Sequence, residues 1–289
     1  MVTPELSMVR GNIVWLASYP KSGNTWLRIV LGHLMNKEKS TIVDINQLPL
    51  LRDGIASGRD LFDEEVGVPA ADLDTDTIDR LRPRVYETLS REANRQMFIK
   101  AHDAYLPTPG GEPMFPRSAT WGVIHVVRNP RDVAVSYADH TAVSLDRAIE
   151  ELGNPQNCWC GKRHRLHEQL RQQLSDWSGH ADSWLNSPLP RLTIRYEDML
   201  ASPEKTFAEV AAFCGLAATA LDVALAVEAS RFERLQEMEA TSRFRESPRR
   251  GGRFFRRGVA GGWKDVLTME QASRIVERHG SMMQRFGYL

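Results

Sequence analysis

Residues 19–26, with the sequence YPKSGNTW, have the composition of an anion-binding loop. An apolar run precedes the loop and a helical pattern follows it, so backbone N–H groups and the positive end of the helix dipole would converge on a bound anion. Gly23 lets the backbone approach a ligand, Lys21 supplies a charge, and Ser22 and Thr25 supply hydroxyl donors. We predict a phosphate-type site here, with an ordinary strand–helix turn as the alternative. It is not the P-loop of nucleoside triphosphatases, because Lys21 precedes the glycine.

A second strand–loop–helix pattern covers residues 126–137 (VVRNPRDVAVSY). Arg128 follows the strand directly, and Ser136 lies two turns into the next helix. Ligands of an open parallel sheet bind beyond the carboxyl ends of the strands, and a guanidinium fork suits a phosphate. The pattern predicts a second anion site, with a surface ion pair as the alternative for Arg128.

A candidate general base, His102, directly follows a short strand pattern at residues 96–101 that contains Lys100. An unperturbed imidazole titrates near pH 6.5, so His102 can be neutral and basic at physiological pH. A histidine at a strand end more often has a structural role, and only the surrounding motifs favour catalysis.

The elements that must position these residues alternate along the chain. Strand patterns occupy residues 12–18, 96–101, 121–127 and 191–196. Helical patterns occupy residues 25–35, 77–94, 131–140, 166–186, a segment from Pro203 to about residue 213 that Ser202 would cap, and a last helix opened by the capping-box spacing at residues 268–271. We predict an α/β fold with a central parallel sheet of about four or five strands and helices on both faces. No repeat or low-complexity linker divides the chain, so residues 1–289 are expected to form a single domain.

Three connections, at residues 37–76, 140–165 and 239–253, are long enough to be surface excursions. Long loops in a compact domain are often lids or binding loops, with disorder as the alternative. We expect such excursions to line the pocket for a second substrate, and nothing in their sequences identifies its class.

The composition excludes several classes of protein. The 37 basic and 37 acidic residues balance, so the chain has no overall field that would attract nucleic acid or an anionic membrane. The three cysteines are too few for a disulfide framework and suit a reducing cytosol. No apolar run approaches the roughly 20 residues of a membrane span. We expect a soluble, cytoplasmic protein.

Four motifs together resemble one enzyme family, the sulfotransferases that use 3′-phosphoadenosine-5′-phosphosulfate (PAPS). Residues 19–26 resemble the family's 5′-phosphosulfate loop, and residues 126–137 resemble its 3′-phosphate motif. Residues 194–199 (IRYEDM) are similar to the YEDL/M block, and residues 256–264 (RRGVAGGWK) to the RKGxxGDWK block. The four stand in the family order over about residues 11–270, which leaves little room for chance.

The resemblance implies a P-loop-like sulfotransferase fold and assigns roles by position. It implies that the 5′-phosphosulfate is held by Lys21, Ser22, Gly23, Asn24 and Thr25. It implies that the 3′-phosphate is held by Arg128, Ser136, Arg256, Arg257 and Gly258. The adenine would contact Trp26, Tyr196 and Phe232. His102 would take the acceptor's proton, Lys21 would steady the leaving phosphate oxygen, and Lys100 would contact the transferring group.

The implied reaction moves a sulfuryl group from PAPS to a small-molecule acceptor, a hydroxyl in preference to an amine, and releases 3′-phosphoadenosine-5′-phosphate (PAP). In-line positioning and stabilisation of negative charge would supply most of the catalysis, and no metal is expected. One alternative is a nucleotide-dependent kinase or other phosphoryl transferase, although ATP would leave the 3′-phosphate cluster unpaired. The other is a non-catalytic PAP-binding protein, which the combination of His102 and Lys21 disfavours.

Two residues depart from the family pattern beside the candidate base. Ala101 replaces a hydroxyl residue, and Asp103 stands where an apolar residue is usual, so the acceptor side is expected to be more polar. The family's dimer motif is matched at Lys264 and Thr268 but not at Met269 and Ser273, which leaves the oligomeric state open.

Other conspicuous residues have an ordinary structural interpretation. Cys158 and Cys160 could form a zinc site with His164 and His167, but Cys-x-Cys is tighter than the usual finger spacing. His125, within a buried strand pattern, is expected to be a hydrogen-bonded core residue. His180 and Trp184 share one face of the predicted 166–186 helix, where core packing explains them as well as substrate contact does. Glu197 and Asp198 are expected to form a structural turn.

Overall fold

The structure is a computed structural model that describes residues 10–36, 45–46, 54–161, 167–244, 246–247 and 253–289. Its strands are β1 (Ile13–Ser18), β2 (Met97–Ala101), β3 (Thr120–Val127), β4 (Cys158–Trp159), β5 (Gln172–Gln173) and β6 (Arg191–Arg195). Its α-helices are α1 (Asn24–Met35), α2 (Arg59–Val66), α3 (Thr75–Glu92), α4 (Pro130–Thr141), α5 (Leu145–Leu152), α6 (Trp177–Leu185), α7 (Tyr196–Ala201), α8 (Pro203–Cys214), α9 (Ala220–Ala229), α10 (Phe232–Thr241) and α11 (Met269–Arg285). Short 3₁₀ turns are η2 (Ala70–Asp72), η3 (Arg117–Ala119) and η4 (Gly262–Asp265).

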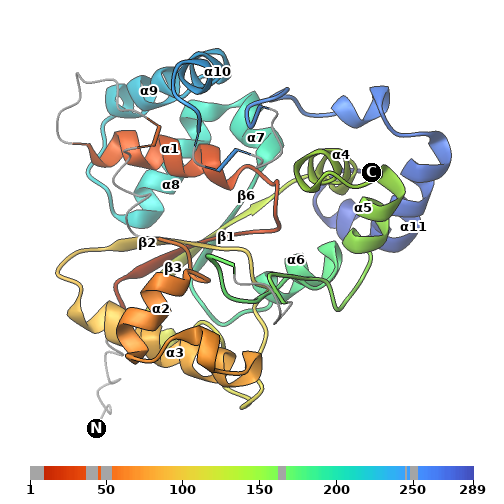
Figure 1. Ribbon diagram of the computed structural model, residues 1–289. Helices are drawn as coiled ribbons and strands as arrows, with labels where there is room; N and C mark the ends of the chain where they lie inside the picture. Colours follow the sequence, from red (N-terminus) through yellow and green to blue (C-terminus); the bar gives the residue numbers. More distant parts are fainter. Residues whose placement is uncertain (1–9, 37–44, 47–53, 162–166, 245, 248–252) are drawn as a thin grey trace, which may run out of the picture.

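Four parallel strands form the central sheet in the order β2-β1-β3-β6. Leu16 of β1, for example, pairs with Lys100 of β2 and with Ile124 of β3. Helices cover both faces, which confirms the predicted α/β class (Figure 1). Because all four strands run the same way, their carboxyl ends meet at one edge. The motifs at residues 19–26, 126–137 and 194–199 and the candidate base His102 lie at these ends, whereas the motif at residues 256–264 comes after α10 in the chain.

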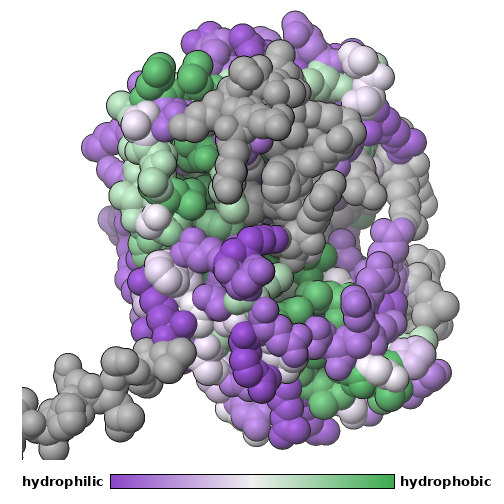
Figure 2. Space-filling view, turned by 90° about the vertical axis from the view of Figure 1, so that its left-hand side faces the viewer, coloured by the Kyte–Doolittle hydropathy of each residue, from purple (hydrophilic) through white to green (hydrophobic). Residues whose placement is uncertain are grey.

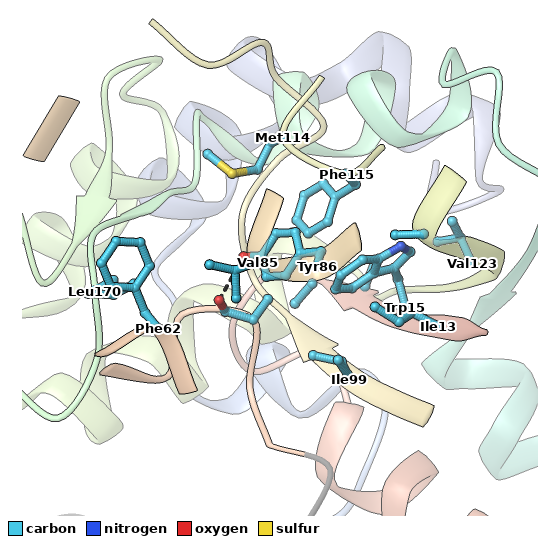
Figure 3. Packing of buried hydrophobic residues seen from close by; sticks show 14 of the residues in the cluster. Ile13, Trp15, Phe62, Val85, Tyr86, Ile99, Met114, Phe115, Val123 and Leu170 are labelled. Atoms are coloured by element: carbon cyan, nitrogen blue, oxygen red, sulfur yellow. Dashed lines mark hydrogen bonds between the residues drawn. The ribbon is translucent and has the colours of Figure 1, made fainter. Parts of the chain in front are cut away.

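Side chains of β1 alternate between two cores. Trp15 lies on one face, where its ring packs edge-on against Tyr86 of α3 and Phe115 at centroid distances of 5.0 and 4.8 Å (Figure 3). Leu16 lies on the other face, in the cluster formed by side chains of α1 and α8. A strand buried on both faces reads as a continuous apolar run, which is why β1 was recognisable from sequence.

A third core lies beside the carboxyl edge of the sheet, where α4, α5, α6 and α11 pack together (Figure 1). Its centre includes Tyr137, Ile149, Trp177 and Ile275, all of them buried. Thr268 caps α11 by accepting a hydrogen bond from the backbone N–H of Gln271, so the predicted capping box is confirmed. This core fixes α4, which carries Ser136 of the second predicted anion site.

Two expectations for local structure are wrong. The segment predicted as one helix over residues 166–186 is helical only from Trp177, because Gln172–Gln173 pairs antiparallel with Cys158–Trp159. Helix α8 begins at Pro203 as predicted, but the side chain of Ser202 makes no capping hydrogen bond. The other predicted strands and helices are present, with bounds that shift by up to two residues.

The three long connections differ in how they turn out. Residues 37–76 include α2 and the start of α3, and residues 140–165 include α5 and β4, so neither is a plain loop. In the third, residues 245 and 248–252 lie outside the described residues, and its role as a lid stays a prediction.

The surface is mixed in character. On the face seen in Figure 2, hydrophobic patches stand between hydrophilic residues. Within the described part of the chain, no helix is long and apolar enough to cross a membrane.

Candidate active site

A cavity of about 1130 Å³ opens at the carboxyl edge of the sheet. It brings together segments far apart in sequence: the loop after β1, the ends of β2 and β3, the start of α7, and the segment before η4. Among its lining residues are Lys21, Gly23, Asn24, Thr25, Trp26, Lys100, His102, Arg128, Ser136, Tyr196, Phe232, Arg256, Arg257 and Gly258. Of the residues predicted from sequence, only Ser22 is not part of the lining.

The loop after β1 curls through two left-handed residues before α1 begins. Lys21 has φ 71° and Gly23 has φ 104°. A side chain at position 23 is excluded, since an added Cβ would lie 2.5 Å from Cδ2 of Tyr196. The hydroxyl of Ser22 is buried and finds no hydrogen-bond partner among the described residues. A buried donor without a partner inside an N–H-rich turn is what an anion-binding loop leaves when its anion is not bound.

Asn24 has a different task from its neighbours. Its side-chain amide donates to the carbonyl oxygen of Leu16 (2.7 Å) and to Oγ of Ser18 (3.1 Å). These bonds fasten the loop to the end of β1, which leaves the backbone N–H of Asn24 as its means of contacting an anion. Thr25, by contrast, directs Oγ1 toward a carboxylate of Glu246 at 3.3 Å.

Two lysines bring positive charge to the same end of the cavity. Burial and the neighbouring Lys100 lower the pKa of Lys21 to about 8, and its Nζ lies 4.4 Å from the ring centroid of Phe254. Burial also lowers the pKa of Lys100, whose Nζ donates to Glu246 at 3.3 Å. An anion that binds beside two such cations raises their pKa values again.

The second anion region is built around Arg128. Its guanidinium lies 4.3 Å from the ring centroid of Tyr196 and donates to the carbonyl oxygens of Lys21 and Val259, both at 3.1 Å. Arg128 therefore joins the loop after β1 to the segment before η4. Asp132 holds that segment as well, since its carboxylate accepts from the backbone N–H groups of Gly261 (2.8 Å) and Trp263 (3.0 Å).

The arginines predicted for the 3′-phosphate lie at the mouth of this region. Arg256 makes a 3.3 Å ion pair with the half-exposed Asp139, and Arg257 is also exposed. Gly258, at φ 61°, packs so closely on Phe232 that an added Cβ would lie 2.3 Å from the ring. The position therefore requires glycine, and Phe232 is held against the predicted phosphate segment.

Aromatic side chains line the same cavity as the two anion regions. Trp26 meets Tyr196 edge-on at 6.1 Å and Phe207 at 5.6 Å. Trp26, Tyr196 and Phe232 all line the cavity, so the three predicted adenine contacts share one site.

His102 is oriented by the backbone. Its Nδ1 lies 2.8 Å from the carbonyl oxygen of Ser18, which can only accept, so Nδ1 carries the proton and Nε2 is left with a lone pair. Its own carbonyl oxygen accepts from Nε2 of the buried His180 (3.2 Å). Burial and the nearby Lys100 charge hold the pKa of His102 well below its usual range. The imidazole is consequently neutral at physiological pH.

Asp103 does not face the acceptor side as its sequence suggested. Its carboxylate binds the buried guanidinium of Arg82 through two bonds of 2.9 and 3.1 Å and accepts from the backbone N–H of Gln173 (3.0 Å). The residue anchors the end of β2 to α3 and β5. The expected extra polarity beside His102 is therefore wrong, because the carboxylate is already neutralised.

Several cavity residues gave no usable sequence signal. Glu246 and Arg28 form a 2.6 Å ion pair inside the cavity, and His140 and Trp159 lie on its wall. Arg28 stands one turn after Thr25 on α1, a spacing that could have suggested a shared helix face. Glu246 is far in sequence from Thr25, Arg28 and Lys100, the partners that it has among the described residues, so its place in the site could not have been predicted.

The remaining structural interpretations hold in part. His125 is a core residue, but neither ring nitrogen has a hydrogen-bond partner in the described structure, so the expectation that it is hydrogen-bonded is wrong. His180 packs in the core, edge-on to Tyr19. Glu197 accepts from the backbone N–H of Asn129 and from the Tyr288 hydroxyl, a structural role as expected.

Within the described ranges, no group of three or more His, Cys, Asp or Glu side chains is placed to hold a metal ion. The zinc alternative at Cys158 and Cys160 included His164, which lies outside those ranges. The absence of a metal remains a prediction.

Comparison with known proteins identifies the family. The sulfotransferase domain model matches residues 12–287. Flavonol 3-sulfotransferase of Flaveria bidentis is 24% identical, with 95% of this chain and 83% of the relative covered, and mouse sulfotransferase 1B1 is 28% identical, with 93% and 82% covered.

Two crystal structures share the fold. Retinol dehydratase complexed with androsterone and PAP has a TM-score of 0.63 at 21% identity, covering 95% of this chain and 81% of that one. Mouse SULT7A1 complexed with PAP has a TM-score of 0.58 at 19% identity, covering 94% and 84%. With its motifs gathered at one cavity and the family model matching almost its whole length, the chain belongs to the sulfotransferase domain family.

Proposed function

We propose that the protein binds PAPS in this cavity and transfers its sulfuryl group to an acceptor hydroxyl, releasing PAP. The observation that carries the proposal is that two separate groups of cations and N–H donors line one cavity together with aromatic side chains. A nucleotide with anions at its 3′ and 5′ positions needs this arrangement. The two related crystal structures named above contain PAP, which supports the assignment.

The chain's residues fit the two ends of such a nucleotide. The unpartnered Ser22 hydroxyl, the hydroxyl of Thr25 and the charge of Lys21 suit the 5′ group. Arg128, Ser136 and the 256–258 segment suit the 3′-phosphate. PAPS supplies the activated sulfuryl group, and the protein supplies position and charge.

We assign the proton transfer to His102. Its Nδ1–H is held by the Ser18 carbonyl, so Nε2 is the nitrogen that accepts the hydroxyl proton as the new sulfate ester bond forms. Lys21 neutralises the charge that grows on the leaving phosphate oxygen, and Lys100 contacts the transferring sulfuryl group. Before any ligand binds, His102 is neutral, and Lys21 and Lys100 line the same cavity.

Two other functions make different demands on the site. ATP has no 3′-phosphate for Arg256 and Arg257 to bind, so this part of the site would have no role in a kinase, and the family membership also disfavours a kinase. A PAP-binding protein without catalysis would not need an oriented neutral imidazole at the cavity wall.

Transfer of labelled sulfate from PAPS to a panel of alcohols, phenols and amines tests the proposal. We expect labelled product with at least one hydroxyl class and stoichiometric PAP. Thermal shift gives a second readout, since PAP should stabilise the protein more than ATP does at equal concentration. Greater stabilisation by ATP, or hydrolysis of PAPS with no transfer to any acceptor, would contradict it.

A further inference from the structure

A carboxylate of the chain itself lies among the cations at the 5′ end of the cavity. Glu246 binds Nη1 of Arg28 through Oε1 (2.6 Å), while its Oε2 accepts from Nζ of Lys100 (3.3 Å) and Oγ1 of Thr25 (3.3 Å). Although burial acts to raise the pKa of Glu246, Lys100 and Arg28 hold it well below its usual range. The side chain is therefore an anion throughout the physiological pH range.

Two of these three donors are ones the proposed function gives to the cofactor. Thr25 and Lys100 are assigned to the 5′-phosphosulfate, and each now directs its donor toward Glu246. A carboxylate and a phosphate or sulfate oxygen make the same demands on such donors. Two anions confined to one cluster of cations also repel each other, so both cannot hold these donors fully.

The third donor is different. Arg28 lies one helical turn deeper on α1 than Thr25 and is buried, and no sequence motif gives it a cofactor contact. It makes the shortest bond to Glu246. Arg28 can therefore keep the carboxylate after the other two donors have been given up.

The placement of Glu246 is supported by its neighbours. Phe244 is buried in a cluster with Ile29 and Phe255, and Oγ of Ser247 donates to the Glu239 carboxylate (2.8 Å). Glu239 also accepts from the backbone N–H groups of Phe254 and Phe255, which lead into the 256–258 segment. Glu246 is thus carried by the same substructure that carries the predicted 3′-phosphate arginines.

We propose that Glu246 is a built-in competitor for the 5′ anion of the nucleotide: it holds Thr25 and Lys100 until that anion displaces it, and Arg28 then retains its carboxylate. The proposal rests on the proposed function. It makes nucleotide affinity depend on a group that contacts no part of the nucleotide once binding is complete.

Calorimetric titration with two ligands tests this. PAP carries the 5′ anion, and adenosine 3′-monophosphate lacks it. Glu246→Gln should bind PAP about tenfold more tightly than the wild type, the size of a typical coupling between sites, and should bind adenosine 3′-monophosphate with unchanged affinity. Glu237→Gln removes the same charge from an exposed position on α10 and is the matched control. Its PAP affinity should not change.

Arg28→Gln provides an opposite change. Without Arg28, Glu246 competes harder for Lys100, so PAP affinity should fall several-fold in the wild-type background and stay constant in the Glu246→Gln background. A fall in both backgrounds would mean that Arg28 attracts the nucleotide directly, which would overturn the role given to it. Circular dichroism confirms that each variant is folded, and Glu246→Ala replaces Glu246→Gln as ligand-binding variant and as background if Glu246→Gln does not fold.

The outcomes separate this inference from the function beneath it. Equal or weaker PAP binding by Glu246→Gln would overturn the competitor role and leave sulfuryl transfer standing. A gain of equal size for both ligands would place the effect outside the 5′ subsite and also overturn it. Failure of the wild type and every variant to bind PAP would instead defeat the proposed function.

Discussion

At the scale of single residues, His102 has the clearest assigned task. His102→Ala should reduce sulfuryl transfer by about 10²- to 10⁴-fold, the usual contribution of a general base. PAP affinity should stay within a few-fold, because the ring is assigned to the acceptor's proton and not to the nucleotide. Initial rates with a non-acidic alcohol, together with calorimetry, measure both quantities.

The choice of acceptor decides whether that experiment is informative. An acidic phenol ionises without help and would hide the loss of a base, so it serves as the control in which the variant should lose much less activity. More than about a tenth of the wild-type rate with the alcohol would remove His102 from the mechanism.

Lys21 offers a readout that does not need turnover. Its pKa is lowered to about 8 by burial and by Lys100, so at pH 8 about half of the free protein carries this lysine uncharged. An anion bound beside it raises the pKa again, and PAP binding should then take up protons at pH 8 and little at pH 6. Titration in buffers of different ionisation enthalpy measures the uptake. Lys21→Arg, which stays charged, should abolish it, and uptake that persists in this variant would assign the proton elsewhere.

At the scale of elements, the segment from Arg256 to Gly258 has one predicted task, binding the 3′-phosphate. Replacing Arg256 and Arg257 by Ala should weaken PAP binding by about 1.5 to 3 kcal/mol for each charge-assisted contact. Adenosine 5′-phosphosulfate, which has no 3′-phosphate, should lose little affinity. Calorimetry with both ligands makes the comparison, and an equal loss for the two would show that the segment does not read the 3′ position.

Elements were predictable where the information is local. Strand β1 was predictable from its continuous apolar run, and the turn after it from Lys21, Ser22 and Gly23. The start of α11 was predictable from its capping box. The hairpin of β4 and β5 was missed, because two-residue strands have no periodicity.

Long-range pairing was not predictable at all. Asp103 looked like part of the acceptor pocket and is instead bound to Arg82, 21 residues away. Lys100 meets Glu246 across 146 residues. A charged residue shows its type in sequence, but only the folded chain shows which opposite charge neutralises it.

At the scale of the whole molecule, buried histidines make the fold sensitive to acid. Burial holds the pKa of His102 and His125 well below their usual range and lowers that of His180 to about 3. In the unfolded chain these histidines bind protons as the pH falls below about 6.5, whereas in the folded protein they stay neutral. The free energy of unfolding therefore has its full value above pH 6.5 and decreases as the pH falls below it. Each such histidine costs about 1 kcal/mol one pH unit below 6.5.

Urea unfolding between pH 5 and 8 measures this dependence. His125→Leu should make the fall below pH 6.5 shallower, and it should also relieve a buried ring that has no hydrogen-bond partner in the described structure. His167→Leu, outside this group, is the control. An unchanged slope for His125→Leu would mean that the ring is not held neutral.

The hydrogen bonds of Arg128 fix the distance between the two anion regions of the cavity. The guanidinium of Arg128 stacks on Tyr196 and donates hydrogen bonds to the carbonyl oxygens of Lys21 and Val259. One planar group therefore sets the spacing between the two anion regions. Tyr196 also packs against Gly23, so the loop after β1 cannot shift toward it. A pocket built in this way measures the separation of two charges as well as their number. Isomers whose second phosphate is at the ribose 2′ position carry the right charge at the wrong span, and we expect the pocket to discriminate against them by length.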